Sequence, residues 1–258
     1  MKKSERLNYI TNILSLQGMV RIRDLSQKLR VSEMTIRRDL DSLVQVNIAD
    51  LIPGGAILKK IPSSDLGEEN YLFSAAGSKM IQEKIKICRK AISLVEINDT
   101  ITIDTGTTTE QLLQFIPSRL PLTIICFTLN ILLKIHEKEN WEIIFTGGRF
   151  HRNTLMFESP EVVELIKKMR INKAFISAAG IDEKLGVTCA NHYEVETKRA
   201  VMQSSDTKIL LSDSSKFGKV KIAYFADLKD FDLVITDTGL DPYYQDMIKD
   251  LGLKLFLV

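Results

Sequence analysis

The chain has 258 residues, of which 45% are hydrophobic and 26% are charged, and its formal net charge is +2. This composition is typical of a soluble globular protein, and the length suffices for two domains or one large α/β domain. No apolar run approaches the roughly 18 residues of a membrane span, and the N-terminus "MKKSERLNYI" lacks the apolar core of a signal peptide. We therefore expect a cytoplasmic protein without a membrane span.

Charge is distributed unevenly along the chain. Residues 1–60 contain 11 Lys/Arg and 6 Asp/Glu, a net charge of +5; the remainder contains 24 basic and 27 acidic residues, a net charge of −3. A basic N-terminal unit on a mildly acidic body indicates a polyanion-binding module attached to a second domain. Chance scatter of surface charge would also give this asymmetry.

The cysteines and histidines do not predict a metal site. There are three of each, and they are not clustered. An odd number of cysteines without a signal peptide fits reduced thiols, and the histidines show no zinc-ligand spacing. The chain also lacks G-x-G-x-x-G and P-loop motifs, so we expect neither a metal nor a nucleotide cofactor.

The chain begins with two short helical patterns. Leu7, Ile10 and Leu14 recur at helical spacing, and Gly18 ends this first helix. A second apolar pattern at the same spacing covers residues 22–29, about two turns of helix.

A third helix, "EMTIRRDLDSLV", follows Ser32, a favourable N-cap residue. Its apolar residues form one stripe, with Thr35 and Arg38 on the opposite face and Arg37 on the flank. A hydroxyl and two guanidinium groups can contact phosphates and guanine edges in a DNA major groove. An ordinary three-helix bundle with a solvated arginine face would show the same pattern.

The next segment, "NIADLIPGGAIL", alternates apolar and polar residues around a Pro-Gly-Gly turn that contains Gly54 and Gly55. This pattern predicts a short β-hairpin, or wing. Together with the three helices it predicts a winged helix-turn-helix domain over residues 1–57.

"VSEMTIRRDLDSL" followed by "PGGAIL" resembles the winged-helix signature of the DeoR family of bacterial sugar-catabolism regulators. The resemblance implies operator double-stranded DNA as a partner. The family usually has Gly, a basic residue and His where this chain has Asn47, Asp50 and Pro53. The prediction of phosphate contacts is therefore weaker for the wing than for the helix. The predicted DNA-binding residues are Ser32, Thr35, Arg37, Arg38, Gly54 and Gly55.

The remainder of the sequence predicts a linker followed by an α/β domain. Residues 58–77 are rich in Pro, Ser, Gly and charge, which predicts a linker. In residues 78–258 a helix precedes seven apolar runs of strand length, and helical segments such as Glu110–Ile116 separate most of them. Apolar strands that alternate with helices predict a Rossmann-like parallel sheet covered on both faces.

Small and polar residues collect where these strands end. Ligands of open parallel sheets bind at the carboxyl ends of the strands, so a shared pocket is predicted there. Ordinary turn chemistry would explain any single case. The strand-end residues are Asp104, Gly106, Thr107, Thr108, Thr109, Phe127, Thr128, Gly147, Gly148, Ala179, Gly180 and Lys216.

The stretch "DTGTTT" offers backbone N–H groups, hydroxyls and a helix N-terminus, which suit a phosphate group. Gly106 allows close approach of the backbone, Lys216 can supply a countercharge, and Asp104 can accept hydrogen bonds from sugar hydroxyls. Simple capping of a helix by the threonines remains an alternative, as does a solvated loop lysine at position 216.

The motifs "DTGTTT", "TGG", "AAGID", "EVETK" and "DSSKFG" stand in the order and spacing of the DeoR-type effector domain. That domain is similar in fold to ribose-5-phosphate isomerase and the CoA-transferases, and it senses phosphorylated sugars. The resemblance implies that Glu194 and Lys198 form the family's Glu…Lys pair near the pocket. A surface i,i+4 ion pair is the alternative.

Phe127 and Ala179 stand where the family usually has an amide and a carboxylate. "CFTLN", "FISAAG" and "GVTC" instead resemble the members that respond to 2-deoxyribose-5-phosphate. A ligand without the 2-hydroxyl gives a buried Asn or Asp less to pair with, and an unpaired buried polar group costs about 1–3 kcal/mol. A different sugar phosphate is the alternative.

We therefore expect a transcriptional repressor of a sugar or nucleoside catabolic operon, relieved by a phosphorylated sugar. We expect it to be a homo-oligomer, because helix-turn-helix proteins usually bind paired half-sites. We expect no enzymatic activity. A sugar-phosphate isomerase, and a DNA-binding structural protein without a ligand, are the competing classes.

Overall fold

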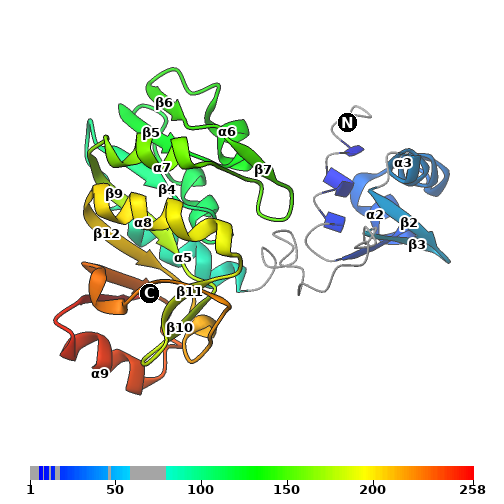
Figure 1. Ribbon diagram of the computed structural model, residues 1–258. Coiled ribbons are helices and arrows are strands. Elements are labelled where there is room, and N and C mark those ends of the chain that lie inside the picture. Colours follow the sequence, from blue (N-terminus) through cyan, green and yellow to red (C-terminus); the bar gives the residue numbers. More distant parts are fainter. Residues whose placement is uncertain (1–5, 8, 12, 15–17, 46–47, 59–79) are drawn as a thin grey trace. The chain divides into compact units, whose positions relative to one another are not determined.

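A computed structural model describes residues 6–7, 9–11, 13–14, 18–45, 48–58 and 80–258 (Figure 1). The chain divides into two compact units, Met1–Asn70 and Tyr71–Val258. Apart from its first residue, the predicted linker lies outside the described residues.

The N-terminal unit is a winged helix-turn-helix, as predicted. The described residues between 6 and 14 are helical. They are followed by β1 (Met19–Arg21), α2 (Ile22–Leu29), α3 (Glu33–Gln45), β2 (Ala49–Ile52) and β3 (Gly55–Leu58). The predicted hairpin is present, and β1, which was not predicted, pairs with β3 to give an antiparallel sheet of order β1-β3-β2.

Apolar residues from all of these helices form one core, including Ile10, Leu25 and Leu40. Within this unit a buried ion pair joins Arg6 to Asp39 of α3, and the guanidinium donates to both carboxylate oxygens. The first helical segment is therefore fixed to α3 by both packing and charge.

The second unit contains a seven-stranded parallel sheet of order β15-β14-β12-β9-β4-β5-β6. All seven apolar runs identified in the sequence are strands of this sheet. They are β4 (Thr100–Ile103), β5 (Leu122–Cys126), β6 (Trp141–Phe145), β9 (Ile171–Ser177), β12 (Ser205–Leu211), β14 (Leu233–Thr236) and β15 (Lys254–Leu257).

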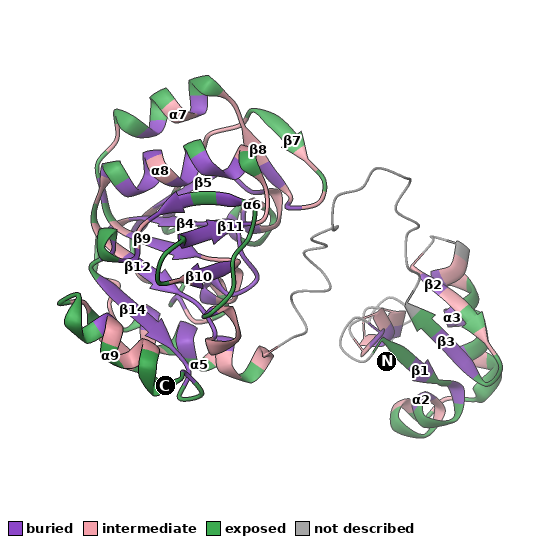
Figure 2. Ribbon diagram, turned by 60° about the horizontal axis from the view of Figure 1, so that its bottom comes forward, coloured by how far each residue is buried: buried purple, intermediate pink, exposed green. Residues whose placement is uncertain are grey.

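Helices cover both faces of the sheet, as the continuous apolar strands predict (Figure 2). One hydrophobic cluster contains residues of α5 (Ile81–Ile92) and α6 (Leu129–Ile135). The other contains residues of α7 (Pro160–Lys167), α8 (Val195–Ser204) and α9 (Pro242–Asp250). Successive residues of one strand alternate between these clusters.

Several elements differ from the prediction or were missed by it. The segment expected to be helical over Glu110–Ile116 is a six-residue 3₁₀ helix, η1 (Thr109–Gln114). The antiparallel pairs come from short, partly polar strands that the apolar pattern does not reveal. The remaining elements are the hairpin β7 (Arg149–His151) and β8 (Met156–Glu158), the small sheet of β10 (Gly180–Asp182), β11 (Gly186–Cys189) and β13 (Ala223–Ala226), and the 3₁₀ helices η2 (His192–Glu194), η3 (Ser214–Lys216) and η4 (Leu228–Asp230).

No helix in the described part of the chain has both the length and the apolar character needed to span a membrane.

Candidate functional site

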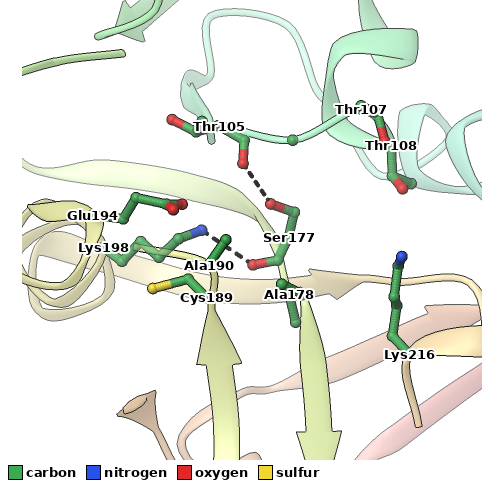
Figure 3. Close-up of a pocket in the computed structure, with 12 residues that line it drawn as sticks. Thr105, Thr107, Thr108, Ser177, Ala178, Cys189, Ala190, Glu194, Lys198 and Lys216 are labelled. Atoms are coloured by element: carbon green, nitrogen blue, oxygen red, sulfur yellow. Dashed lines mark hydrogen bonds between the residues drawn. The ribbon is translucent and has the colours of Figure 1, made fainter. Parts of the chain in front are cut away.

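A cleft lies at the carboxyl ends of β4 and β9, which are neighbours in the sheet (Figure 3). The loop after β4, the end of β9, β11, η2 with α8, and η3 all contribute to it. Its lining residues are Thr105, Gly106, Thr107, Thr108, Ser177, Ala178, Ala179, Cys189, Ala190, Glu194, Lys198 and Lys216.

The loop after β4 provides backbone donors. Within the described residues, the N–H groups of Gly106, Thr107 and Thr108 donate no hydrogen bond to another part of the protein. A Cβ atom at position 106 would lie 2.4 Å from Ser177 Oγ, so only glycine fits. Successive free N–H groups in a loop favour an anion. The helix dipole contributes less than expected, because η1 is short and 3₁₀.

Beneath this loop lies a buried ion pair between Lys198 and Asp104, each 2% exposed. Lys198 Nζ donates to Asp104 Oδ2 and, at 3.1 Å, to the carbonyl oxygen of Ser177. Asp104 Oδ2 also lies 2.9 Å from the backbone N and the Oγ of Ser177. The carboxylate therefore joins the loops that follow β4 and β9, rather than pointing into open solvent.

Electrostatics keep Lys198 charged. Burial alone lowers the pKa of Lys198, but the nearby carboxylates of Asp104 and Glu194 raise it by more, so its pKa lies above the usual value. Among the described residues, Asp104 Oδ1 and Thr105 Oγ1 are buried without a hydrogen-bond partner. Buried polar atoms of this kind are rare in native proteins unless a ligand or water satisfies them.

Glu194 lies beside the pair and is also buried, at 4% exposed. Its Oε1 accepts hydrogen bonds from Asn191, 3.0 Å from the backbone N and 2.8 Å from Nδ2. Burial raises the pKa of Glu194, and Lys198 opposes that shift. Since both side chains of the Glu194/Lys198 pair are buried, the alternative of a surface i,i+4 ion pair is excluded.

A polar network continues from Glu194 toward the β7–β8 hairpin. Asn153 Nδ2 donates to Asn191 Oδ1 at 3.2 Å, and Tyr193 Oη donates to Asn153 Oδ1 at 2.7 Å. The ring of His151 stacks on Tyr193 with 3.6 Å between centroids. The sequence did not point to these residues, because the hairpin that carries Asn153 and His151 was not predicted.

A further lysine approaches the loop from α5. Lys84 is 1% exposed, and its Nζ donates to Thr107 Oγ1 at 3.0 Å. We did not select it from the sequence. The available signal was its place on the apolar stripe of Ile87, Cys88 and Ala91, where helical spacing directs a side chain into the core.

The structure brings half of the predicted effector residues together at the cleft. Those that line it are Gly106, Thr107, Thr108, Ala179, Glu194, Lys198 and Lys216. Those that do not are Asp104, Thr109, Phe127, Thr128, Gly147, Gly148 and Gly180.

Phe127 was predicted to contact the effector, but it does not line the cleft. Its side chain is fully buried in the hydrophobic cluster that includes α7 and α8. The residue follows β5, and the alternation of that strand directs its side chain into the core and away from the cleft. The predicted contact of Phe127 with a ligand therefore has no geometric basis here.

The other displaced residues have structural roles. Thr109 Oγ1 lies 2.7 Å from the carbonyl oxygen of Asp104, which shapes the loop. Thr128 is the N-cap residue of α6. At Gly148 and Gly180, a Cβ atom would lie 2.6 Å and 2.5 Å from backbone oxygens of neighbouring segments. Gly147, with φ +72°, lies at the turn between β6 and β7.

The exposed face of α3 is the second candidate site. Arg37 and Arg38 are exposed, as predicted, and so are Met34, at 59%, and Asp41. Thr35 is only half-buried, so the outward stripe is centred one residue earlier than the sequence indicated. The sequence did not predict the exposure of Met34, because an apolar residue near the start of a helix is usually expected in the core.

The capping and wing residues behave differently from one another. Ser32 Oγ accepts from the backbone N–H of Thr35 at 3.2 Å, so it caps α3 as predicted. Gly54 is exposed at the turn with φ +81°. Gly55 is buried, and a Cβ atom there would lie 2.0 Å from Val20 O in β1. The structure therefore does not place Gly55 at the surface where DNA would contact it.

Each half of the chain matches a known domain family. Residues 6–61 match the DeoR-like helix-turn-helix domain, and residues 79–238 match the DeoR C terminal sensor domain. The chain is 32% identical to the deoxyribose operon repressor of Escherichia coli over 98% of both chains. It is also 32% identical to the lactose phosphotransferase system repressor of Staphylococcus epidermidis, over 93% of this chain and 94% of that one.

Among solved structures, the ribose 5-phosphate isomerase A of Methanocaldococcus jannaschii is similar at 16% identity with a TM-score of 0.39, over 52% of this chain and 53% of that chain. The family assignment rests on the two domain matches and on the relatives that align along nearly the whole chain. This protein belongs to the DeoR family of helix-turn-helix transcriptional regulators.

Proposed function

We propose that this protein represses a sugar or nucleoside catabolic operon and that a phosphorylated sugar relieves the repression. The observation that carries the proposal is the cleft at the ends of β4 and β9. There, unpaired N–H groups of the Thr105–Thr108 loop meet Lys216, while Lys84 and Lys198 lie buried behind them. Such an arrangement favours a small dianion over a neutral sugar.

The favoured effector is 2-deoxyribose-5-phosphate. The resemblance to the deoxyribose operon repressor supports this choice, as does Ala179, which lines the cleft where the family usually has a carboxylate. Phe127 does not support this choice, because its side chain lies in the core. The alternative is another sugar phosphate, since a repressor of the lactose phosphotransferase system is also 32% identical.

Operator DNA binds, in this proposal, to the exposed face of α3, with Arg37 and Arg38 as principal contacts. Paired half-sites require at least a dimer. Effector binding favours a state of the protein that fits DNA less well, and such coupling free energies are typically about 1–3 kcal/mol. The effector residues that we propose are those that line the cleft.

Thermal unfolding of the full chain with four ligands tests the sensor function. The ligands are 2-deoxyribose-5-phosphate, ribose-5-phosphate, fructose-1-phosphate and inorganic phosphate. A ligand at a hundred times its dissociation constant stabilises the folded state by about 2.7 kcal/mol. Stabilisation by the deoxypentose phosphate alone supports the favoured effector. A response to another sugar phosphate replaces the effector, and no response to any of the four contradicts the sensor function.

A DNA experiment tests the regulator function. Fragments selected from genomic DNA by the protein should be released by the stabilising sugar phosphate and retained with inorganic phosphate. Sequence-specific binding that no sugar phosphate changes would favour a DNA-binding protein without a ligand.

We propose no enzymatic activity. In the described part of the cleft, Glu194, buried with a raised pKa beside Lys198, is a feature that suits proton transfer. Against this, Ala179 lines the cleft where isomerases of this fold carry acidic residues, and the relatives are named repressors. Incubation with ribose-5-phosphate should give no ketose phosphate; turnover that Glu194→Gln abolishes would contradict the proposal.

A further inference from the structure

Lys84 is a buried lysine on α5, whose other buried residues are hydrophobic and belong to the core. It lies on the inner face of α5 next to Ile87 and Cys88, and its Nζ reaches Thr107 Oγ1 at 3.0 Å. Cys88 Sγ lies 3.1 Å from Thr108 O, so α5 contacts this part of the loop at two consecutive residues. A buried ammonium group on an apolar stripe is unfavourable unless its surroundings use the charge.

Two charges that act on Lys84 come from one other segment of the described chain, around η3. Asp213, which is buried just before η3, favours the charged form of the ammonium group, and Lys216 of η3 disfavours it. The thiol of Cys88, on the same helix, lies nearby and has a pKa raised to about 12, chiefly by burial. Burial is the largest effect and lowers the pKa of Lys84 to about 8. Burial is thus what most disfavours the charged form of Lys84, and an anion bound at the loop would oppose this effect.

We propose that Lys84 is a cationic anchor of the anion site, acting through Thr107 and the loop from behind, and that binding of a dianion there is coupled to proton uptake by this lysine. The inference rests on the proposed function, because it assigns a further residue and a pH response to the same cleft. It differs in its prediction, since the sensor function alone requires neither Lys84 nor a dependence on pH.

The direction of the pH dependence follows from the charges. A bound dianion stabilises the ammonium form, so the pKa of Lys84 is higher in the bound protein than in the free protein, where it is about 8. Between these two values the bound protein holds more protons, and affinity falls by up to tenfold for each pH unit of increase. A phosphate monoester is already a dianion above about pH 6, so the ligand does not cause this decline.

Calorimetric titration of the full chain between pH 6.5 and 9.5 tests the inference. The probes are 2-deoxyribose-5-phosphate and inorganic sulfate, whose charge is constant over this range. For the wild type we expect affinity to fall at least tenfold between pH 7.5 and 9.5. Paired titrations in buffers of different ionisation enthalpy should show proton uptake that is greatest near pH 9.

Lys84→Gln should bind at least tenfold more weakly at pH 7, and its affinity should not change with pH. Lys84→Met keeps the length of the side chain without the charge and should behave in the same way. The matched control is Lys86→Gln, an exposed lysine of the same helix, which should titrate like the wild type.

The outcomes distinguish the role of Lys84 from the sensor function. If the wild type binds the sugar phosphate but Lys84→Gln keeps both affinity and pH dependence, the role of Lys84 is wrong and the sensor function stands. If the wild type binds neither probe, both proposals fall. Should both Lys84 variants fail to fold, wild-type proton uptake decides: uptake near pH 9 supports the inference, and none overturns it.

Discussion

The two halves of this protein display positive charge in opposite ways. Arg37 and Arg38 of α3 are exposed, whereas Lys84 and Lys198 of the sensor unit are almost fully buried. An exposed guanidinium gains affinity for a long polyanion chiefly by releasing counterions. A buried ammonium instead meets one small anion at a fixed geometry. The first arrangement tolerates varied DNA sequence but is sensitive to salt, and the second makes each lysine part of the folded structure.

The largest expected difference between the halves concerns stability. Lys198→Met leaves the carboxylate of Asp104 buried without its cation, which should destabilise the sensor unit by about 3–5 kcal/mol. Urea unfolding would measure this change. Arg37→Ala should change stability by no more than about 0.5 kcal/mol. Asp104→Asn combined with Lys198→Met should recover most of the loss; an equal loss in the double variant would show that the charge pair is not the cause.

A smaller loss of stability is expected from a side chain added at Gly106 in the cleft. Gly106→Ala places a Cβ atom 2.4 Å from Ser177 Oγ, so the loop must shift, at about 1–3 kcal/mol. Binding of 2-deoxyribose-5-phosphate should be lost with it. The control is Gly106→Ala with Ser177→Gly, which removes the two atoms nearest to the added Cβ. If the single variant binds normally, the loop is not the anion site.

The DNA side of the comparison is tested by salt dependence. Arg37→Ala and Arg38→Ala should each weaken binding to a selected fragment, and a lost phosphate contact should reduce the slope of log affinity against log salt by about 1. Stabilisation by the sugar phosphate should be unchanged. Lys229→Ala, an exposed lysine of the sensor unit, is the control for net charge. Equal effects of all three variants would contradict a specific role for α3.

The smallest effect is that of the N-cap. Ser32→Ala removes the side-chain acceptor of the Thr35 N–H and should destabilise α3 by about 1 kcal/mol. Amide hydrogen exchange would show faster exchange in the first turn of α3 and no change in the sensor unit. Ser32→Asn, which also caps, should restore protection. Unchanged exchange in Ser32→Ala would mean that the cap contributes little.

The sequence predicted the framework better than the site. Long apolar strands and the capped third helix leave clear periodic patterns, so the parallel sheet and the winged helix were predicted correctly. The short strand β1 depends on a partner distant in the chain, β3. The hairpin strands β7 and β8 have three residues each, too few to leave such a pattern. Local pattern also could not separate the 3₁₀ helix η1 from an α-helix.

Within the site, the chain order of strand ends identified the loop after β4 but not which side chains face the cleft. Phe127 follows a strand end, yet the pleat directs it into the core. Lys84 lies about 20 residues before the loop and reaches it only through the packing of α5. The directions of these two side chains depend on tertiary packing, which a pattern along the sequence does not predict.

Gly55 carries a consequence for how members of this family can diverge. Because Val20 O occupies the space of any side chain at this position, the wing strand β3 is locked to β1, far away in the chain. Selection for a new operator therefore has little freedom at the inner wing residue. In the proposed mode of DNA binding, it can act on the exposed positions of α3, around Met34 and Arg38, where substitutions leave the scaffold intact. Changes of regulatory target should accordingly accumulate on one helical face while the turn beside it stays fixed.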